Sequence, residues 1–207
     1  MRILITGGTR GIGAALARAY RKPENEVAAP GSKGLDVTNP ASITNFLSRL
    51  NGIDLLICNA GVFVDEQGGP IDNVSAEQWA QTLDVNVTGV ALTIASSLNL
   101  LRKSSSPKIA IISSQMGSNT LAPGGSYAYR ASKAAAINIG RNLATDLKPE
   151  GIPVGIYHPG WVQTDMGGET AEITESEATA GLVQRFEELD LESTGCFLTW
   201  DGREHPL

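Results

Sequence analysis

Short apolar runs alternate along the chain with longer stretches in which apolar residues recur every three or four positions. The short runs predict strands, and the longer stretches have the spacing of amphipathic helices. Strands are predicted at 2–6, 26–29, 33–37, 53–58, 108–112, 152–157 and 196–200. Helices are predicted at 11–22, 40–50, 75–101, 126–148 and 174–189.

Helix-end signals support several of these boundaries. Asn39 is a good N-cap with Pro40 at the first helical position, and Ser75 with Gln78 has the spacing of a capping box. Pro149 and Gly151 are expected to stop the long Ala-rich helix that begins near Ser126.

Strands that are apolar throughout, alternating with amphipathic helices, predict a parallel sheet covered on both faces. Because no linker or internal repeat interrupts the pattern, residues 1–207 are predicted to form a single doubly wound α/β domain of the Rossmann type. The second-strand region is shortened: residues 13–36 leave too little chain for a strand, a full helix and another strand. One helix is therefore expected to be reduced to a turn at 30–34.

Composition narrows the class of protein. The net charge is −6 without a Lys/Arg cluster, which argues against a nucleic-acid partner. No continuous apolar run approaches the roughly 20 residues of a membrane span, so no membrane association is expected. Cys58 and Cys196 have no CxxC spacing, which disfavours a disulfide scaffold or a metal site, and free thiols in the cytoplasm fit best.

The segment from Thr6 to Gly13 is rich in glycine and joins the first strand to the first helix. Glycines there allow a tight turn and a close approach to a pyrophosphate, which the helix N-terminal amides hold. A glycine pattern alone can be a mere turn, but its place after an N-terminal strand favours a dinucleotide site.

The choice between NAD and NADP depends on the end of the second strand, where an acidic residue selects NAD. Residues 28–33 carry no carboxylate, and Arg10 and Lys33 are suited to a 2′-phosphate. The alternative is that both are solvated surface charges. The sequence thus predicts NADP(H), with NAD(H) less favoured.

Tyr129 and Lys133 are four residues apart, so both project from the same side of a predicted helix. An ammonium near a phenol lowers the pKa of the phenol and prepares it for proton transfer. Such a pair is usually a solvated helix face, and its significance here comes from the Gly-rich loop, Asn59-Ala60-Gly61 and Ser113-Ser114, which end neighbouring elements.

Taken together, these motifs closely resemble those of the short-chain dehydrogenase/reductase family over nearly the whole chain. The matching segments are 6–13, 59–61, 113–114, 129–133 and 159–164. The segments 127–133, 158–168 and 201–206 resemble the C-factor and sniffer-type carbonyl reductase branch.

The resemblance implies four catalytic roles. Tyr129 would be the general acid in carbonyl reduction and the base in the reverse direction, and Lys133 would hold the nicotinamide ribose and lower the tyrosine pKa. Ser114 would hydrogen-bond the substrate oxygen, and Asn86 would bend a helix and anchor a proton-relay water. Ser113 stays a lesser candidate, because Ser114 precedes Tyr129 by fifteen residues and an insertion at 118–125 must absorb the difference.

The resemblance also assigns the cofactor contacts, together with Tyr129 and Lys133. They are Gly7, Thr9, Arg10, Ile12, Gly13, Asp36, Val37, Asn59, Ala60, Gly61, Trp161, Val162 and Thr164. It further implies a homodimer or homotetramer.

Segments 62–73 and 166–180 are expected to form a lid over the site, because both contain glycine and are long enough to move. An apolar pocket for a neutral ketone or aldehyde would be lined by Phe63, Met116, Leu121, Tyr127, Trp161 and Met166. His158 is expected to end a strand rather than to act in catalysis.

The sequence therefore predicts an NADP(H)-dependent oxidoreductase acting on a small carbonyl or alcohol. The alternative of another class is a dinucleotide-binding regulator or C-factor-like signalling protein, which would not need Asn86, Ser114, Tyr129 and Lys133 together. An epimerase or dehydratase is disfavoured, because only some 45 residues follow Trp161.

Overall fold

A computed structural model describes residues 1–207 and places six parallel strands in one sheet. The strand order is β2-β1-β3-β4-β5-β6, and every neighbouring pair is parallel. The strands are β1 (Arg2–Ile5), β2 (Glu26–Ala28), β3 (Leu55–Cys58), β4 (Lys108–Ile112), β5 (Val154–His158) and β6 (Phe197–Thr199). The order reverses between β1 and β3, which makes the carboxyl ends of these two strands the topological switch point of the sheet.

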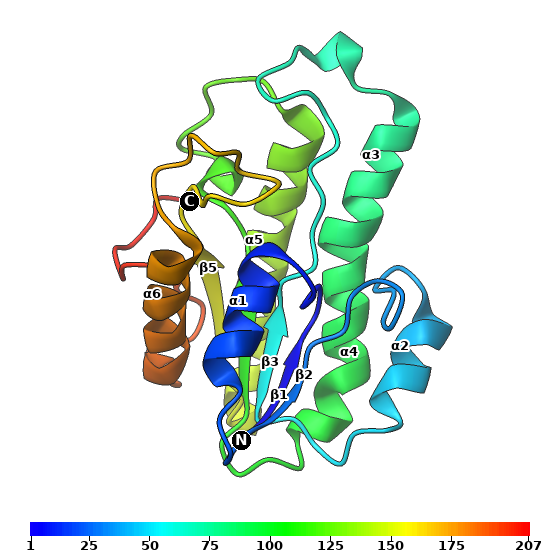
Figure 1. Cartoon of the computed structure of the whole chain (residues 1–207), viewed down its shortest axis with the longest axis vertical. Helices are drawn as coiled ribbons and strands as arrows, with labels where there is room; N and C mark the ends of the chain where they lie inside the picture. Colours follow the sequence, from blue (N-terminus) through cyan, green and yellow to red (C-terminus); the bar gives the residue numbers. More distant parts are fainter.

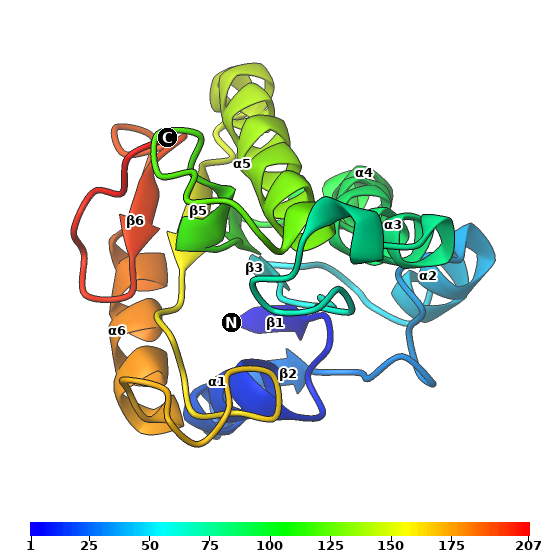
Figure 2. The ribbon, with the colours of Figure 1, turned by 90° about the horizontal axis from the view of Figure 1, so that it is seen from above.

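Helices cover both faces of the sheet, as Figure 2 shows from above. One face carries α1 (Gly11–Tyr20) and α6 (Glu175–Glu188), which pack together. The other carries α2 (Pro40–Leu47), α4 (Gly89–Leu101) and the long α5 (Tyr127–Leu147). Two large apolar clusters, one on each face, and a third of only three residues form the core, and the buried strands contribute to both large clusters. The sequence prediction of a single doubly wound α/β domain is therefore confirmed.

Helix boundaries follow the signals in the sequence. The side chain of Asn39 accepts hydrogen bonds from the amides of Ala41 and Ser42 at the start of α2. Ser75 and Gln78 form the predicted capping box of α3 (Ala76–Leu83). Thr174 makes a second capping box with Glu177 at the start of α6.

The predicted strand at 33–37 is wrong. Residues 32–34 form a turn, and 35–39 run without strand pairing into α2. This agrees with the expected reduction of a helix to a turn, but the chain is too short to return to the sheet. β2 is consequently an edge strand of only three residues.

The helix predicted over 75–101 is continuous but not uniform (Figure 1). A π-helical segment, η2 (Asp84–Thr88), separates α3 from α4. By length and composition alone, the helical stretch Ala76–Leu101 is long and apolar enough to cross a membrane. This was not expected from the sequence, because polar residues interrupt the apolar positions of this stretch. Its residues Ile94 and Leu101 lie in the core beneath the sheet, and core helices pass the same test.

Gly140 sets the distance between α5 and the sheet. A Cβ at this position would lie 2.5 Å from Ile156 Cγ1 of β5. We expect Gly140→Ala to lower the free energy of unfolding by roughly 1–2 kcal/mol, because overpacking exceeds the gain in helix propensity. Urea denaturation measures this, with Arg141→Ala at the next, exposed position of α5 as control. A Gly140→Ala protein as stable as the parent would contradict the packing argument.

Candidate active site

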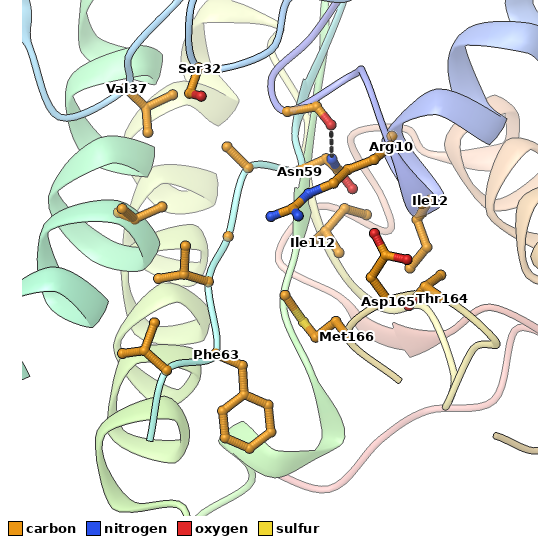
Figure 3. Close-up of a pocket in the computed structure, with 18 of the residues that line it drawn as sticks. Arg10, Ile12, Ser32, Val37, Asn59, Phe63, Ile112, Thr164, Asp165 and Met166 are labelled. Carbon is orange, nitrogen blue, oxygen red and sulfur yellow. Dashed lines mark hydrogen bonds between the residues drawn. The ribbon is translucent and has the colours of Figure 1, made fainter. Parts of the chain in front are cut away.

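A cleft of about 760 Å³ opens at the carboxyl ends of the strands, at the switch point between β1 and β3. Its volume is in the range of cofactor and substrate sites. Figure 3 shows Arg10 and Asn59 toward the Gly-rich loop, and Phe63 at the opposite end. Thr164 and Met166 lie along one wall. The cleft thus runs from the Gly-rich loop to the start of α5.

The Gly-rich loop has the close backbone approaches that its glycines were expected to allow. Gly7 has φ +64°, and a Cβ at Gly13 would lie 2.3 Å from the carbonyl oxygen of Gly7. Arg10 precedes α1 in extended conformation, and no side chain caps this helix. The first amides of α1 are therefore available to an anion at the cleft.

Hydrogen bonds join this loop to the chain that follows β3. The hydroxyl of Thr6 accepts from the amides of Asn59 and Ala60 at 3.1 and 3.0 Å. The side-chain amide of Asn59 donates to the carbonyl oxygens of Thr6 and Gly7 at 3.0 and 3.2 Å. Asn59 therefore fixes the shape of the loop as well as lining the cleft.

The shortened region forms the other side of this end of the cleft. Ser32, Asp36 and Val37 line it, with Arg10 opposite. Asp36 Oδ1 accepts hydrogen bonds from the amide and hydroxyl of Thr38, so this carboxylate stabilises the local turn at 36–38. Lys33 is exposed and does not line the cleft, which leaves Arg10 as the cation placed for a phosphate there.

At the far end, Tyr129 and Lys133 lie one turn apart on α5 and are both buried. Lys133 Nζ lies 5.5 Å from the centroid of the Tyr129 ring and donates to the carbonyl oxygen of Ile112 at 3.1 Å. Phe63 stacks on Tyr129 with ring centroids 4.2 Å apart. The pair is therefore part of the cleft wall, not a solvated helix face.

Burial dominates the acid–base state of both groups. Burial raises the pKa of Tyr129 to about 12, while contact with the Ser114 hydroxyl opposes this and the charge of Asp65 adds to it. Burial lowers the pKa of Lys133 to about 8. Lys133 is not among the causes of the shift in the Tyr129 pKa, and the loss of hydration is the largest of them, so the expected lowering by Lys133 is not seen in this structure.

Both serines that end β4 are buried, in different surroundings. Ser114 interacts with the Tyr129 phenol, and its hydroxyl also accepts from the Met116 amide at 3.1 Å. Ser113 donates to the carbonyl oxygen of Lys133 at 2.9 Å and thereby fixes α5. The effect on the Tyr129 pKa favours Ser114 as the serine that acts on the phenol, whereas Ser113 and not Ser114 lines the cleft. Residues 118–125, where the longer spacing predicts an insertion, form neither helix nor strand.

Asn86 lies within the π-helical segment and is buried. Its side chain binds Val62 twice, accepting from the amide and donating to the carbonyl oxygen, both at 2.8 Å. It also donates to Ser132 on α5 at 3.0 Å. Asn86 does not line the cleft, and its side chain holds the post-β3 segment against α5.

The segment after β5 supplies the remaining wall. Thr164, Asp165 and Met166 line the cleft, whereas Trp161 and Val162 do not. Trp161 donates its indole N–H to the carbonyl oxygen of Gly167 at 2.7 Å. Of the predicted apolar pocket, Phe63 and Met166 line this cleft, whereas Met116, Leu121, Tyr127 and Trp161 do not.

His158 is the last residue of β5, as expected, and burial lowers its pKa to about 4. No group of three or more His, Cys, Asp or Glu side chains is arranged to hold a metal ion. Cys58 and Cys196 are free thiols.

Sequence reasoning missed Asp65, Gln67 and Gln81, which also line the cleft. Asp65 is 6% exposed although it lies in a loop rich in polar residues. No spacing pattern marks it, since its partners lie more than 60 residues further along the chain.

A parallel sheet with a Gly-rich loop, a Tyr-Lys pair and a serine at one cleft defines a dinucleotide-binding oxidoreductase class. The short chain dehydrogenase family model matches residues 32–175, and the chain belongs to this family.

Individual relatives agree with this assignment. C-signal from Myxococcus xanthus is 38% identical over 157 residues, covering 74% of this chain and 92% of its own. An NADPH-bound carbonyl reductase from chicken fatty liver superposes with a TM-score of 0.88 at 28% identity, covering 100% of this chain and 98% of its own. The carbonyl reductase Sniffer of D. melanogaster gives 0.90 at 26% identity, with 100% and 99% covered.

Lys133 is expected to cost stability. Its pKa in the fold is about 8 against an ordinary 10.5, so the unfolded chain binds more protons between these values and stability rises with pH there. We expect Lys133→Met to raise the free energy of unfolding on the order of 1–3 kcal/mol at pH 7, and this gain to shrink as pH rises from 8 toward 10.5.

Denaturant titrations at several pH values test this, with Lys148→Met as the control. Lys148 is exposed just beyond the end of α5, where the same change removes a charge without relieving burial. A Lys133→Met protein that is less stable than the parent at pH 7 would show that the ammonium is well compensated.

Proposed function

We propose that this chain is an NADP(H)-dependent carbonyl reductase or alcohol dehydrogenase. The observation that carries the proposal is one continuous cleft with the Gly-rich loop and Arg10 at one end and Tyr129 with Lys133 at the other. NADP(H) supplies a hydride from its nicotinamide when it is bound.

Different residues of the chain would bind the cofactor and transfer the proton. The uncapped amides of α1 and the loop glycines would hold the pyrophosphate, and Lys133 would hold the nicotinamide ribose. Ser114 would hydrogen-bond the carbonyl oxygen of the substrate. Tyr129 would give its phenolic proton to that oxygen as hydride reaches the carbonyl carbon, and would take it back from an alcohol in the reverse direction.

The acid–base state of the site supports the reductive direction at neutral pH. Because burial raises the pKa of Tyr129 to about 12, the phenol holds its proton there and is ready to donate it. Alcohol oxidation requires the phenolate, so its rate is expected to rise with pH. The apolar surfaces of Phe63 and Met166 fit a neutral ketone or aldehyde of modest size.

Support for NADP(H) comes from charge and from relatives. Residues 28–33 at the end of β2 carry no carboxylate, Arg10 lies at the same end of the cleft, and the similar carbonyl reductase from chicken fatty liver binds NADPH. A cytoplasmic homodimer or homotetramer is the assembly proposed from the family resemblance.

A signalling protein that binds a dinucleotide without turnover is the second candidate, and the likeness to C-signal favours it. Such a protein would have no need of a buried phenol beside a serine hydroxyl. Oxidation of reduced nicotinamide, followed by absorbance with a panel of ketones and aldehydes, decides between the two.

We expect Tyr129→Phe to lower turnover of a carbonyl substrate by about 10²–10⁴-fold, because the change removes only the proton donor. The dissociation constant for NADPH, measured by fluorescence, should stay within about twofold of the parent, since little affinity depends on the hydroxyl. Tyr127→Phe removes a hydroxyl two positions away from a side chain that is 36% exposed, and should leave turnover unchanged. Full activity in Tyr129→Phe would refute the assignment.

Arg10→Ser is expected to weaken NADPH binding by roughly tenfold, about 1.4 kcal/mol, while NADH binding changes little. The reason is that only NADPH presents a phosphate for the guanidinium to bind. Lys33→Ser is the control, since Lys33 carries the same charge nearby but does not line the cleft. Equal losses for NADPH and NADH in Arg10→Ser would contradict phosphate recognition by this residue.

A further inference from the structure

The start of α5 is not capped by the residue that precedes it. Ser126 is the one non-glycine residue in the left-handed region, with φ +51°, and its side chain makes no hydrogen bond to the helix amides. Its hydroxyl instead accepts from the amide of Gly68 at 2.9 Å. The first turn of α5 must therefore find its acceptor elsewhere.

Asp65 provides that acceptor from the loop after β3. Its Oδ2 accepts from the amides of Ala128 and Tyr129 at 3.1 and 3.4 Å, which are the second and third residues of α5. This is the bonding of an N-cap, made by a residue more than 60 positions away, and the carboxylate also lies at the positive end of the helix dipole. Asp65 is 6% exposed, and its Oδ1 has no hydrogen-bond partner.

The surrounding loop is held firmly against the helix. A Cβ at Gly125 would lie 2.7 Å from Gly68 Cα, so the two backbones are in contact. Phe63, two residues before Asp65, stacks on the ring of Tyr129. Figure 1 shows the chain after β3 running alongside the first turns of α5. Asp65 thus joins the cofactor side of the cleft to the helix that carries the phenol.

We propose that Asp65 is a positioning residue for Tyr129: it fixes the first turn of α5 from the loop after β3, and places a negative charge at the helix turn that carries the phenol. The proposal rests on the proposed function of Tyr129 as general acid and base. The proposal accounts for the burial of the Asp65 carboxylate against the first amides of α5.

Three other charged groups lie near the phenol or the start of α5. Lys133 lies one turn along α5, and Asp165 lines the cleft from the segment after β5. Arg130 is directed to the carbonyl oxygens of Gly125 and Met116.

The other elements that contact α5 near its start add little charge. The 3₁₀ turn Gln115–Gly117 has no charged residue, and Glu77 and Asp84 of α3 and η2 are exposed. The charge of Asp65 raises the pKa of Tyr129, in addition to the larger effect of burial.

The test uses Asp65→Asn and Asp65→Ala in the full chain saturated with cofactor. Asparagine keeps an oxygen that accepts the two amides but removes the charge, so the pKa of Tyr129 should fall. The pH profile of alcohol oxidation should move to lower pH by roughly half a unit or more, with kcat at its plateau within about threefold of the parent. Asp65→Ala should show the same displacement and a further loss in kcat of about tenfold or more, because the phenol is no longer held in place.

Glu66→Gln is the matched control. Glu66 is the neighbouring carboxylate on the same loop, but it is exposed and does not act on the phenol, so the profile should not move. An unchanged profile in Asp65→Asn would overturn the proposal. So would an Asp65→Ala protein that loses only thermal stability while it keeps the parent kcat and pH profile. If Asp65→Ala does not fold, Asp65→Asn still decides the question.

A second readout separates this proposal from the proposed function. Stopped-flow pH jumps follow the ultraviolet absorbance of the phenolate, and the difference between each protein and its Tyr129→Phe version isolates Tyr129. If the parent turns over no carbonyl compound, the proposed function fails, yet a lower phenolate midpoint in Asp65→Asn still supports the effect of Asp65 on the phenol. A midpoint that Asp65→Asn leaves unchanged refutes that effect even in an active enzyme.

Discussion

The hydrogen bonds between Thr6 and Asn59 are the constraint on which the site depends. A parallel sheet whose strand order reverses between β1 and β3 sends the following chain to opposite faces, which opens a crevice there. A crevice between two free loops would have no fixed shape. Four hydrogen bonds from Thr6 and Asn59 join the loops at the point where they diverge. Gly13 completes the arrangement, since any side chain there would collide with Gly7.

The same segment that Asn59 begins continues to the end of the cleft where Tyr129 lies. Asn86 binds both backbone groups of Val62, Phe63 covers Tyr129, and Asp65 caps α5. One stretch of irregular chain is thus held at successive points between the Gly-rich loop and the helix that carries Tyr129 and Lys133. Burying a polar group costs free energy unless it is hydrogen-bonded, which explains why the side-chain amides of Asn59 and Asn86 are both paired with backbone groups.

Most of the fold and the principal site residues were predictable, because they depend on local patterns. The apolar runs define the strands, Asn39 and Ser75 mark helix starts, and the Tyr129–Lys133 spacing needs only a helix. The predictions are wrong or incomplete where the structure of a residue depends on contacts with distant parts of the chain. The β-branched and apolar residues near Val37 look like a strand, but the short chain leaves no room for pairing. The pKa of Tyr129 depends on burial, and Asp65 is defined only by contacts distant in sequence, so neither leaves a local pattern.

The shortened region makes the two ends of the cleft physically different. Because β2 is a three-residue edge strand followed by a turn, the cofactor end is bordered by exposed residues such as Arg10 and Ser32. Charges at that end act through water and contribute modestly to affinity. The other end buries Tyr129, Lys133 and Asp65, where low polarity strengthens each interaction and shifts pKa values. Cofactor choice can therefore change through surface residues near β2 without disturbing Tyr129, Lys133 and Asp65, since these three lie at the other end of the cleft.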